Sequence, residues 1–408
     1  MFSSILHPSL EVPNWNTGRF WLLRLGLYKL ISPKYISDDW IWIVDHSVQI
    51  GKEKCFVILG IRMKDHPLQE DYLKHEDVEP IHIEIVEQSN AEIVFEQLES
   101  CIIKTGVPRA ILSDNGSDIK GGVKLFCDKH KETDHFYDIK HMTSNILKRV
   151  LEKDEQYASF CTFASKVKNQ LQQTDLACFA PVNQKSKARY MNIDELLNWA
   201  NYILTILNNI DMAKDSEIKI SNLKKELGEN YDLNKLENKL GGLKDFKSKI
   251  QYWKELSAIM KTTVEFVRYE GYYTNCGKDL RKKLISDNPQ TKAIIDDLLS
   301  LLNKESAKCG PSERMISSSE IIESVFGRQK QFEKQQCKSG FTVFILTIAA
   351  SVSKTSSAII EQALTTVSTK QLLDWKEKNI GKTLQSKKRR LINYIKNGTN
   401  MASERTEA

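Results

Sequence analysis

Residues 40–45 read Trp-Ile-Trp-Ile-Val-Asp, an apolar run that ends in a carboxylate. A short apolar run of this kind, rich in β-branched and aromatic residues, is typical of a buried strand. A turn over residues 50–54 leads into a second apolar run over residues 55–61, so the two runs predict a hairpin. The fold is therefore expected to start from two antiparallel strands, the first of which carries Asp45.

Further strands and helices follow the hairpin. Residues 80–86 alternate with period two and predict a third strand, and residues 91–104 repeat apolar side chains at helical spacing. A short strand over 109–113, a helix near 122–130 and a fifth strand over 135–139 complete the pattern. The order strand-strand-strand-helix-strand-helix-strand predicts an α/β fold with a mixed sheet, in which the first and fourth strands are neighbours.

The 408 residues are enough for two or three domains. The α/β pattern gives way to a mainly helical one, so we predict a large all-α insertion and a helical C-terminal part. The predicted segments are an N-terminal lead-in over 1–39, the first part of the α/β core over 40–142, the helical insertion over 143–312, the second part of the core over 313–375 and a basic tail over 376–408.

The positive charge of the chain is concentrated in this tail. The whole chain has 59 Lys and Arg against 53 Asp and Glu, a net charge of +6. Residues 376–408 contain nine basic and three acidic residues, which is also +6, so the rest of the chain is neutral. Two interpretations of the tail stay open, a segment that binds DNA phosphates and a solvated terminus.

Composition argues against several classes of protein. No apolar run reaches the length of about 18 residues that a membrane span needs, and residues 1–13 lack the pattern of a signal peptide. The eight cysteines form no Cys-x-x-Cys pair, which argues against a zinc site or a disulfide framework. We therefore expect a cytoplasmic protein with reduced thiols and no membrane contact.

Two aspartates stand at the ends of predicted neighbouring strands. Asp45 closes the first strand and Asp114 closes the fourth. Two adjacent carboxylates repel unless a divalent cation lies between them, and carboxylate oxygens suit Mg²⁺ or Mn²⁺. Two such ions can activate a water and stabilise the leaving oxygen of a phosphodiester. A turn role for Asp114 stays open, because Asp-Asn-Gly is also a common turn sequence.

The residues around Asp114 resemble a known family. Residues 107–117, Val-Pro-Arg-Ala-Ile-Leu-Ser-Asp-Asn-Gly-Ser, resemble the second-acid motif of retroviral integrases and DDE transposases, which share the RNase H-like fold. Val44 and Asp45 fit the first-acid position of that family. The resemblance implies an RNase H-like sheet flanked by helices, and a third acid on a helix that packs against the sheet.

Glu323 is the predicted third acid. It follows Asp114 by 209 residues, a spacing that resembles the transposases of bacterial insertion sequences with a long helical insertion before the last acid. Three alternatives stay open: Glu320, one turn before Glu323; Glu152, which follows Asp114 by 38 residues; and Asp138 on the predicted fifth strand.

DNA contacts are predicted around these acids. Lys330 shares a helical face with Glu323, and the resemblance implies that it contacts a DNA phosphate. Ile316 and Ser319 stand where the family has Tyr and Arg. The positive charge of that Arg would then come from Arg314 or Arg328. His141 lies near the N-terminus of a predicted helix and could contact a DNA phosphate there, because helix N-termini favour anions. The alternative for His141 is a capping or packing role. The predicted contacts are Lys330, Arg328, Asn115, His141, Lys387, Lys388, Arg389 and Arg390.

The resemblance implies a DDE transposase in which Asp45, Asp114 and Glu323 hold two Mg²⁺ or Mn²⁺ ions. Such an enzyme cuts DNA at transposon ends, and the freed 3′-hydroxyl attacks target DNA. It implies a homodimer in the complex with DNA, and a bacterial, nucleoid-associated location. The alternatives are an RNase H-like endonuclease or resolvase without strand transfer, and a truncated or domesticated DNA-binding derivative without activity.

Overall fold

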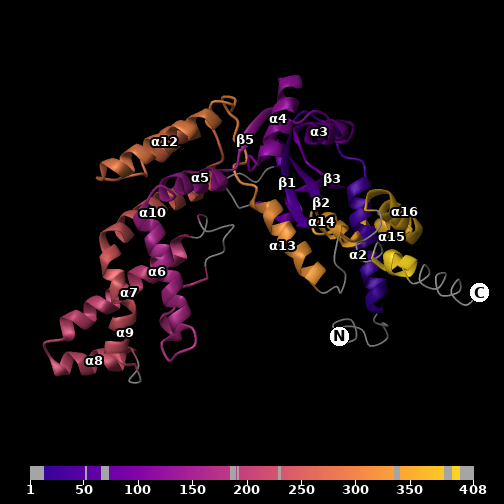
Figure 1. Cartoon of the computed structure of the whole chain (residues 1–408). Helices are drawn as coiled ribbons and strands as arrows, with labels where there is room; N and C mark the ends of the chain where they lie inside the picture. The colour runs from indigo at the N-terminus through magenta and orange to yellow at the C-terminus, as the bar shows by residue number, and fades with distance from the viewer. Residues whose placement is uncertain are drawn as a thin grey trace, which may run out of the picture. The chain divides into compact units, whose positions relative to one another are not determined.

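The computed structural model describes residues 13–50, 53–65, 73–183, 190, 193–227, 231–334, 341–380 and 388–395. The chain divides into two compact units, whose elements are labelled in Figure 1. The first, here called the sheet unit, comprises Met1–Asp138 and Met315–Ala408. The second, here called the helical unit, comprises Ile139–Arg314. In the sequence, the helical unit is thus an insertion between two parts of the sheet unit.

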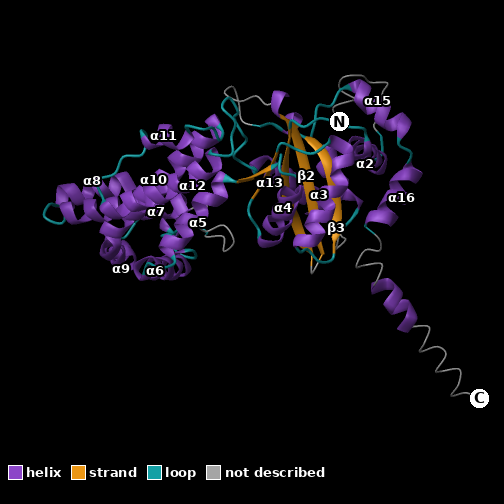
Figure 2. Cartoon of the chain, turned by 90° about the horizontal axis from the view of Figure 1, so that it is seen from above, coloured by secondary structure: helices purple, strands orange, loops and turns teal. Residues whose placement is uncertain are grey.

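Five strands of the sheet unit form one sheet in the order β3-β2-β1-β4-β5, drawn in orange in Figure 2. The pairs β1/β2 and β2/β3 are antiparallel, whereas β1/β4 and β4/β5 are parallel. This arrangement confirms the predicted mixed α/β sheet with the first and fourth strands side by side. The strands are β1 Trp40–Ile50, β2 Glu53–Arg62, β3 Glu79–Val86, β4 Ala110–Ser113 and β5 Asp134–Tyr137.

Helices of the sheet unit come from both ends of the chain. In sequence order they are α2 Trp15–Ile31, η1 Met63–Asp65, η2 His75–Asp77, α3 Ala91–Thr105, α4 Ser117–Lys129, α13 Glu320–Lys334, η5 Val343–Leu346, α14 Thr347–Ala350, α15 Ser357–Thr366 and α16 Thr369–Asn379. A further helix covers residues 388–395.

Local sequence sets the bounds of α3 and α4. The side chain of Asn90 accepts a hydrogen bond from the amide of Ile93 and caps α3, and Gly106 ends it with φ +85°. Helix α4 begins at Ser117, five residues before the predicted start. The reason is that Asp114-Asn115-Gly116 completes the turn out of β4, so the helix can start immediately.

The two faces of β1 have different surroundings. Trp42 and Val44 belong to a core cluster that also contains Leu98 of α3 and Phe126 of α4. Because side chains alternate along a strand, Asp45 points to the opposite face. Helix α13 contacts β1 but contributes no residue to this cluster, so it covers the face to which Asp45 points.

Cations of α2 tie the lead-in to the C-terminal helices. The ammonium group of Lys29, which is buried, donates to the carbonyls of Val352 (2.6 Å) and Ser353 (3.1 Å) and to the Thr355 hydroxyl (2.6 Å). Arg24 donates to two carbonyls at the end of α15. Cations stabilise helix C-terminal ends because carbonyl groups there lack partners. The lead-in is therefore part of the sheet unit's core.

The helical unit is built around an aromatic cluster. Trp253 is fully buried, packs against Tyr157 and Phe160 at ring distances of 5.1 and 5.3 Å, and donates from Nε1 to Asp154 Oδ2 (3.0 Å). The elements of this unit are α5 Ile139–Leu151, α6 Glu155–Leu171, η3 Ala177–Phe179, α7 Ile193–Ala213, α8 Glu217–Leu227, α9 Leu233–Leu240, η4 Gly241–Phe246, α10 Lys247–Glu270, α11 Cys276–Arg281 and α12 Pro289–Ser306.

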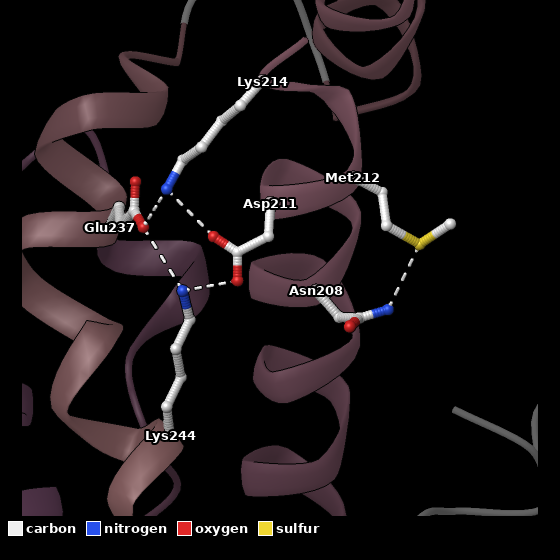
Figure 3. Close-up of polar contacts among 6 residues, drawn as sticks. All are labelled: Asn208, Asp211, Met212, Lys214, Glu237 and Lys244. Atoms are coloured by element: carbon white, nitrogen blue, oxygen red, sulfur yellow. Dashed lines mark hydrogen bonds and ion pairs between the residues drawn. The ribbon is translucent and has the colours of Figure 1, made fainter.

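Ion pairs join α7, α9 and η4 on the surface of the helical unit (Figure 3). Lys214 lies 2.9 Å from Asp211 and 2.7 Å from Glu237, and Lys244 lies 2.7 Å and 3.3 Å from the same two carboxylates. Each charge thus has two opposite neighbours. Such a closed network orients the three elements, although each exposed pair alone contributes little to stability.

The predictions of no membrane span and of reduced cysteines can be compared with the described residues. None of the described helices is both long and apolar enough to cross a membrane. The seven described cysteines are free thiols, and Cys337 lies outside the described residues.

His82 on β3 is expected to make the stability of the sheet unit depend on pH. Burial opposes its protonation, but hydrogen bonds with Cys101 and with Glu84 (3.0 Å) outweigh burial and raise the pKa of His82 to about 9. In the unfolded chain the pKa of a histidine is about 6.5. The contribution of His82 is therefore fully present below pH 6.5 and is lost as the pH rises through 9.

We expect the free energy of unfolding to fall by at most about 3 kcal/mol over this window. Urea unfolding at a series of pH values measures it. In His82→Gln the same window should be nearly flat. An undiminished pH dependence in that variant would assign the effect to other groups.

Candidate functional site

Asp45 and Asp114 lie side by side at one edge of the sheet. In the parallel pair of β1 and β4, Val44 is aligned with Ser113. Asp45 and Asp114 are the residues that directly follow this pair in the sequence. Neighbouring strands are about 4.8 Å apart. The end of β4 therefore lies beside the middle of β1, which continues to Ile50, so the expectation that Asp45 closes its strand is corrected.

Each of these carboxylates accepts a hydrogen bond from the backbone that follows it. Asp45 Oδ1 lies 2.6 Å from the amide of His46, and Asp114 Oδ1 lies 2.8 Å from the amide of Gly116. Asn115, which lies between Asp114 and Gly116 in the turn, has φ +63°, a left-handed conformation that asparagine adopts more readily than most residues other than glycine. Its Oδ1 is buried without a hydrogen-bond partner among the described residues. A buried polar atom of this kind is more frequent at functional sites than elsewhere.

Asp138 connects this edge of the sheet to the start of α13. Its amide donates to the carbonyl of Ser113, at the end of β4 (3.0 Å). Its buried carboxylate accepts from the amide and the hydroxyl of Ser319, at 2.6 and 2.9 Å. Asp138, which sequence reasoning considered as a third acid, therefore fixes the helix on which Glu323 lies.

Helix α13 presents its acids in its first turn. Glu320 and Glu323 both lie there, and both side chains are half-buried. Ile322 and Val325 are fully buried and form the packed side of the helix. Because Ser319 is bound at the strand ends and α13 packs on β1, the first turn of α13 lies on the same face and near the same edge as Asp45.

The predicted DNA contacts of α13 lie on its exposed side. Arg328 and Lys330 are both exposed. Burial and the nearby charge of Arg328 lower the pKa of His75. The His75 ring lies 3.0 Å from the hydroxyl of Ser324, beside Glu323. Helix α13 thus has two exposed cations in its second half, five and seven residues after Glu323.

A second polar cluster lies behind the two aspartates and was missed by sequence reasoning. Lys54 and the ring of His46 lie 2.9 and 3.7 Å from Asp118 Oδ2 in the first turn of α4, and Ser89 lies 3.2 Å from His46. Burial opposes ionisation of Asp118, but hydrogen bonds from Ser89 and Lys54 outweigh it and lower its pKa to about 2. The available signal was an acid placed four residues after Asp114, at the start of a helix.

The donor set has the right chemistry for a divalent ion, because carboxylate oxygens are the ligands that Mg²⁺ and Mn²⁺ prefer. The observed alignment brings together two of the three predicted carboxylates, Asp45 and Asp114. Among the described residues, however, no three His, Cys, Asp or Glu side chains form a group that could hold a metal ion. The role of Glu323 as a metal ligand therefore stays a prediction.

Other predicted residues lie elsewhere in the chain. His141 lies in α5, and Glu152 is the first residue after the end of α5. Both belong to the helical unit. Glu152 lies 4.0 Å from Lys148 and accepts from the hydroxyl of Tyr190 (3.4 Å). In the tail, Lys388, Arg389 and Arg390 begin an exposed helix, whereas Lys387 lies outside the described residues.

Comparison with known proteins gives no family for the chain. No protein-family model matches it, and no curated protein matches it. Among solved structures it is similar to a chain described as "Drosophila P element transposase strand transfer complex", with a TM-score of 0.40 and 13% sequence identity over 90% of this chain and 88% of that one. Similarity at this level does not establish membership in a family, so the function of the chain depends on its own residues.

Proposed function

We propose that the chain is a DDE-type DNA transposase that cuts and joins DNA by phosphoryl transfer. The observation that carries this proposal is the alignment of Val44 with Ser113 on neighbouring parallel strands, which makes Asp45 and Asp114 the residues that follow this pair. The anchoring of α13 by Asp138 at the same strand ends supports it, because it brings Glu323 to that side of the sheet.

In this proposal Asp45, Asp114 and Glu323 would hold two Mg²⁺ or Mn²⁺ ions. When bound, such ions supply Lewis acidity at the attacked phosphate and lower the pKa of a water. The carboxylates orient the site, and Asn115, Arg328 and Lys330 bind the DNA backbone. Phosphate contacts of this kind position the strand without reading its sequence.

The proposed reaction has two transfers. First, a water oxygen attacks a phosphodiester at the transposon end, the bond from phosphorus to O3′ breaks, and a free 3′-hydroxyl is left. Second, that hydroxyl oxygen attacks a phosphodiester of target DNA, and the bond from phosphorus to the target's O3′ breaks. The partners are therefore two DNA segments, and a homodimer would hold the two transposon ends together.

A second candidate is a DNA-binding derivative that does not cleave. It is favoured by the described side chains, in which the carboxylates do not gather into a group of three. Both candidates predict DNA binding, and only the first predicts chemistry.

A joining assay separates the candidates. Duplex oligonucleotides of random sequence with free 3′-hydroxyl ends are incubated with the full chain, a supercoiled plasmid and Mg²⁺ or Mn²⁺, and joints are sequenced. Joined products that disappear with EDTA are expected. Nicked plasmid without joints would indicate an endonuclease without strand transfer. Binding without either product would overturn the enzymatic proposal.

The basic helix over residues 388–395 provides a prediction about DNA binding. Replacement of Lys388, Arg389 and Arg390 by Gln removes three exposed charges. Each lost phosphate contact lowers the slope of log K against log salt by about 0.9, so the slope should fall by about 3. Filter binding of a plasmid fragment from 50 to 200 mM salt, roughly the range over which such contacts lose affinity, measures it.

A matched control removes three exposed lysines of α8, Lys219, Lys224 and Lys225. This variant loses the same net charge. An equal loss of slope in both variants would show that overall charge, and not the tail, determines DNA binding.

A further inference from the structure

A cavity of about 540 Å³ lies in the sheet unit, and Asp45, Asp114 and Glu323 are not among the residues that line it. It is formed by the end of α2 and the loop after it, strand β3, the last turn of α3, and α16. Its volume is within the range of about 300–1,000 Å³ that small-molecule sites occupy. Nothing in the proposed DNA chemistry uses it.

Three cations line this cavity. The Lys34 side chain is only 6% exposed, and its ammonium group contacts the carbonyl of Lys29 (2.8 Å) and Glu79 (3.2 Å). Lys104 donates to the carbonyl of Ile81 (2.7 Å) with one of its three N–H groups. His82 is the third cation, because its pKa is raised to about 9.

These cations outnumber their carboxylate neighbours. Glu79 pairs with Lys34, and Glu84 pairs with His82. Burial lowers the pKa of Lys34, its ion pair with Glu79 opposes this effect, and the charge of Lys104 adds a smaller lowering. Like charges that face one another in a partly buried site are unfavourable without an anion. A bound anion would remove this repulsion.

The walls and rim of the same cavity are apolar. Three isoleucines that line it are largely exposed, Ile31 at 55%, Ile36 at 61% and Ile103 at 84%. Trp375 of α16 also lines it. Exposed apolar side chains that surround a cavity mark a binding surface more often than scattered ones do.

We propose that this cavity binds a small organic anion. Lys34 and Lys104 hold its carboxylate, phosphate or sulfonate group, the charge of His82 adds to the positive potential there, and the isoleucines and Trp375 contact its apolar body. Five of the twelve lining residues are leucine or isoleucine, which suits a ligand with a hydrocarbon part and does not suit a row of stacked bases, since those need several aromatic side chains.

The test is a fluorescence titration of the full chain with 8-anilinonaphthalene-1-sulfonate, an aromatic sulfonate. Saturable binding with one site per chain is expected. Ile103 is the most useful position, because its exposed side chain can change without disturbing the core. Ile103→Glu and Ile103→Lys remove the same apolar contact, but the Glu variant should bind at least about fivefold more weakly than the Lys variant.

Two further variants test the cations. Lys104→Met should weaken binding about tenfold or more, because a charge-assisted hydrogen bond is lost. Lys124→Met, an exposed change on α4, should leave the dissociation constant unchanged. Equal constants for the two Ile103 variants, or no effect of Lys104→Met, would overturn the proposal.

Competition identifies the class of ligand. Octanoate should displace the fluorophore, whereas inorganic phosphate at the same concentration should not, since it has no apolar part. Equal displacement by phosphate would refute the role of the apolar walls. A different result would be that a short oligothymidylate displaces the fluorophore and binds Ile103→Glu more weakly than Ile103→Lys. That result would assign the cavity to nucleic acid and refute a small-molecule site.

Discussion

Asp45→Asn and Asp114→Asn are each expected to abolish DNA cleavage and joining, with a loss of about a thousandfold or more. A divalent ion contributes several kcal/mol to a phosphoryl-transfer step, and each 1.36 kcal/mol corresponds to about a tenfold change in rate. Asparagine keeps the shape of the side chain but removes the charge that would hold the ion. Plasmid nicking with Mn²⁺ and the joining assay both measure the loss.

Stability should respond in the opposite direction. Asp45 and Asp114 directly follow the aligned pair Val44 and Ser113, so without a bound cation we expect the two charges to repel. Removing one charge should leave the melting temperature unchanged or raise it slightly, and DNA binding should persist. Full nicking activity in Asp45→Asn would remove the basis of the proposed enzyme.

Two neighbouring glutamates provide a matched comparison for the third acid. Glu320 and Glu323 lie in the same first turn of α13 and are both half-buried. If Glu323 is the third acid, Glu323→Gln should lose activity as completely as Asp45→Asn, whereas Glu320→Gln should keep most of it. The reverse result would exchange their roles.

The sheet could be predicted because its signals are local. Each strand is a short apolar run, and the turn after residue 114 is evident from Asp-Asn-Gly. The position of β4 next to β1 followed from the order of elements and the resemblance. Asp45 and Asp114 were found in this way because each directly follows a short apolar run, although β1 continues to Ile50, so that Asp45 lies within its strand and only Asp114 follows the end of one.

Other parts of the site depend on partners that no local pattern reveals. Asp138 binds Ser319, which is 181 residues later, and Lys29 binds the carbonyl of Val352, which is 323 residues later. His46 and Asp118 meet because β1 places His46 on the face opposite to Asp45, where α4 packs. Such contacts follow from the assembled sheet and from the packing of helices on it.

Asp138→Ala is expected to destabilise the sheet unit by about 2–3 kcal/mol, because it leaves the buried amide of Ser319 without its acceptor. Ser319→Ala removes only the hydroxyl bond and should cost about 1 kcal/mol. The two changes act on one contact, so the double variant should be less destabilised than the sum of the single ones. Urea unfolding of the four proteins measures this coupling.

Activity then separates two roles of Asp138. If Asp138 positions α13, Asp138→Ala and Ser319→Ala should both reduce nicking, and Asp138→Ala should reduce it more because it removes both hydrogen bonds to Ser319. Nicking is measured at a temperature where both variants are folded. Activity should also be partly retained, since Glu323 is still present. If Asp138→Ala instead abolished nicking while Ser319→Ala had no effect, Asp138 itself would be the third acid. Its bond to Ser319 would then be one that metal binding has to break, since the same oxygen, Oδ2, accepts both donors of Ser319.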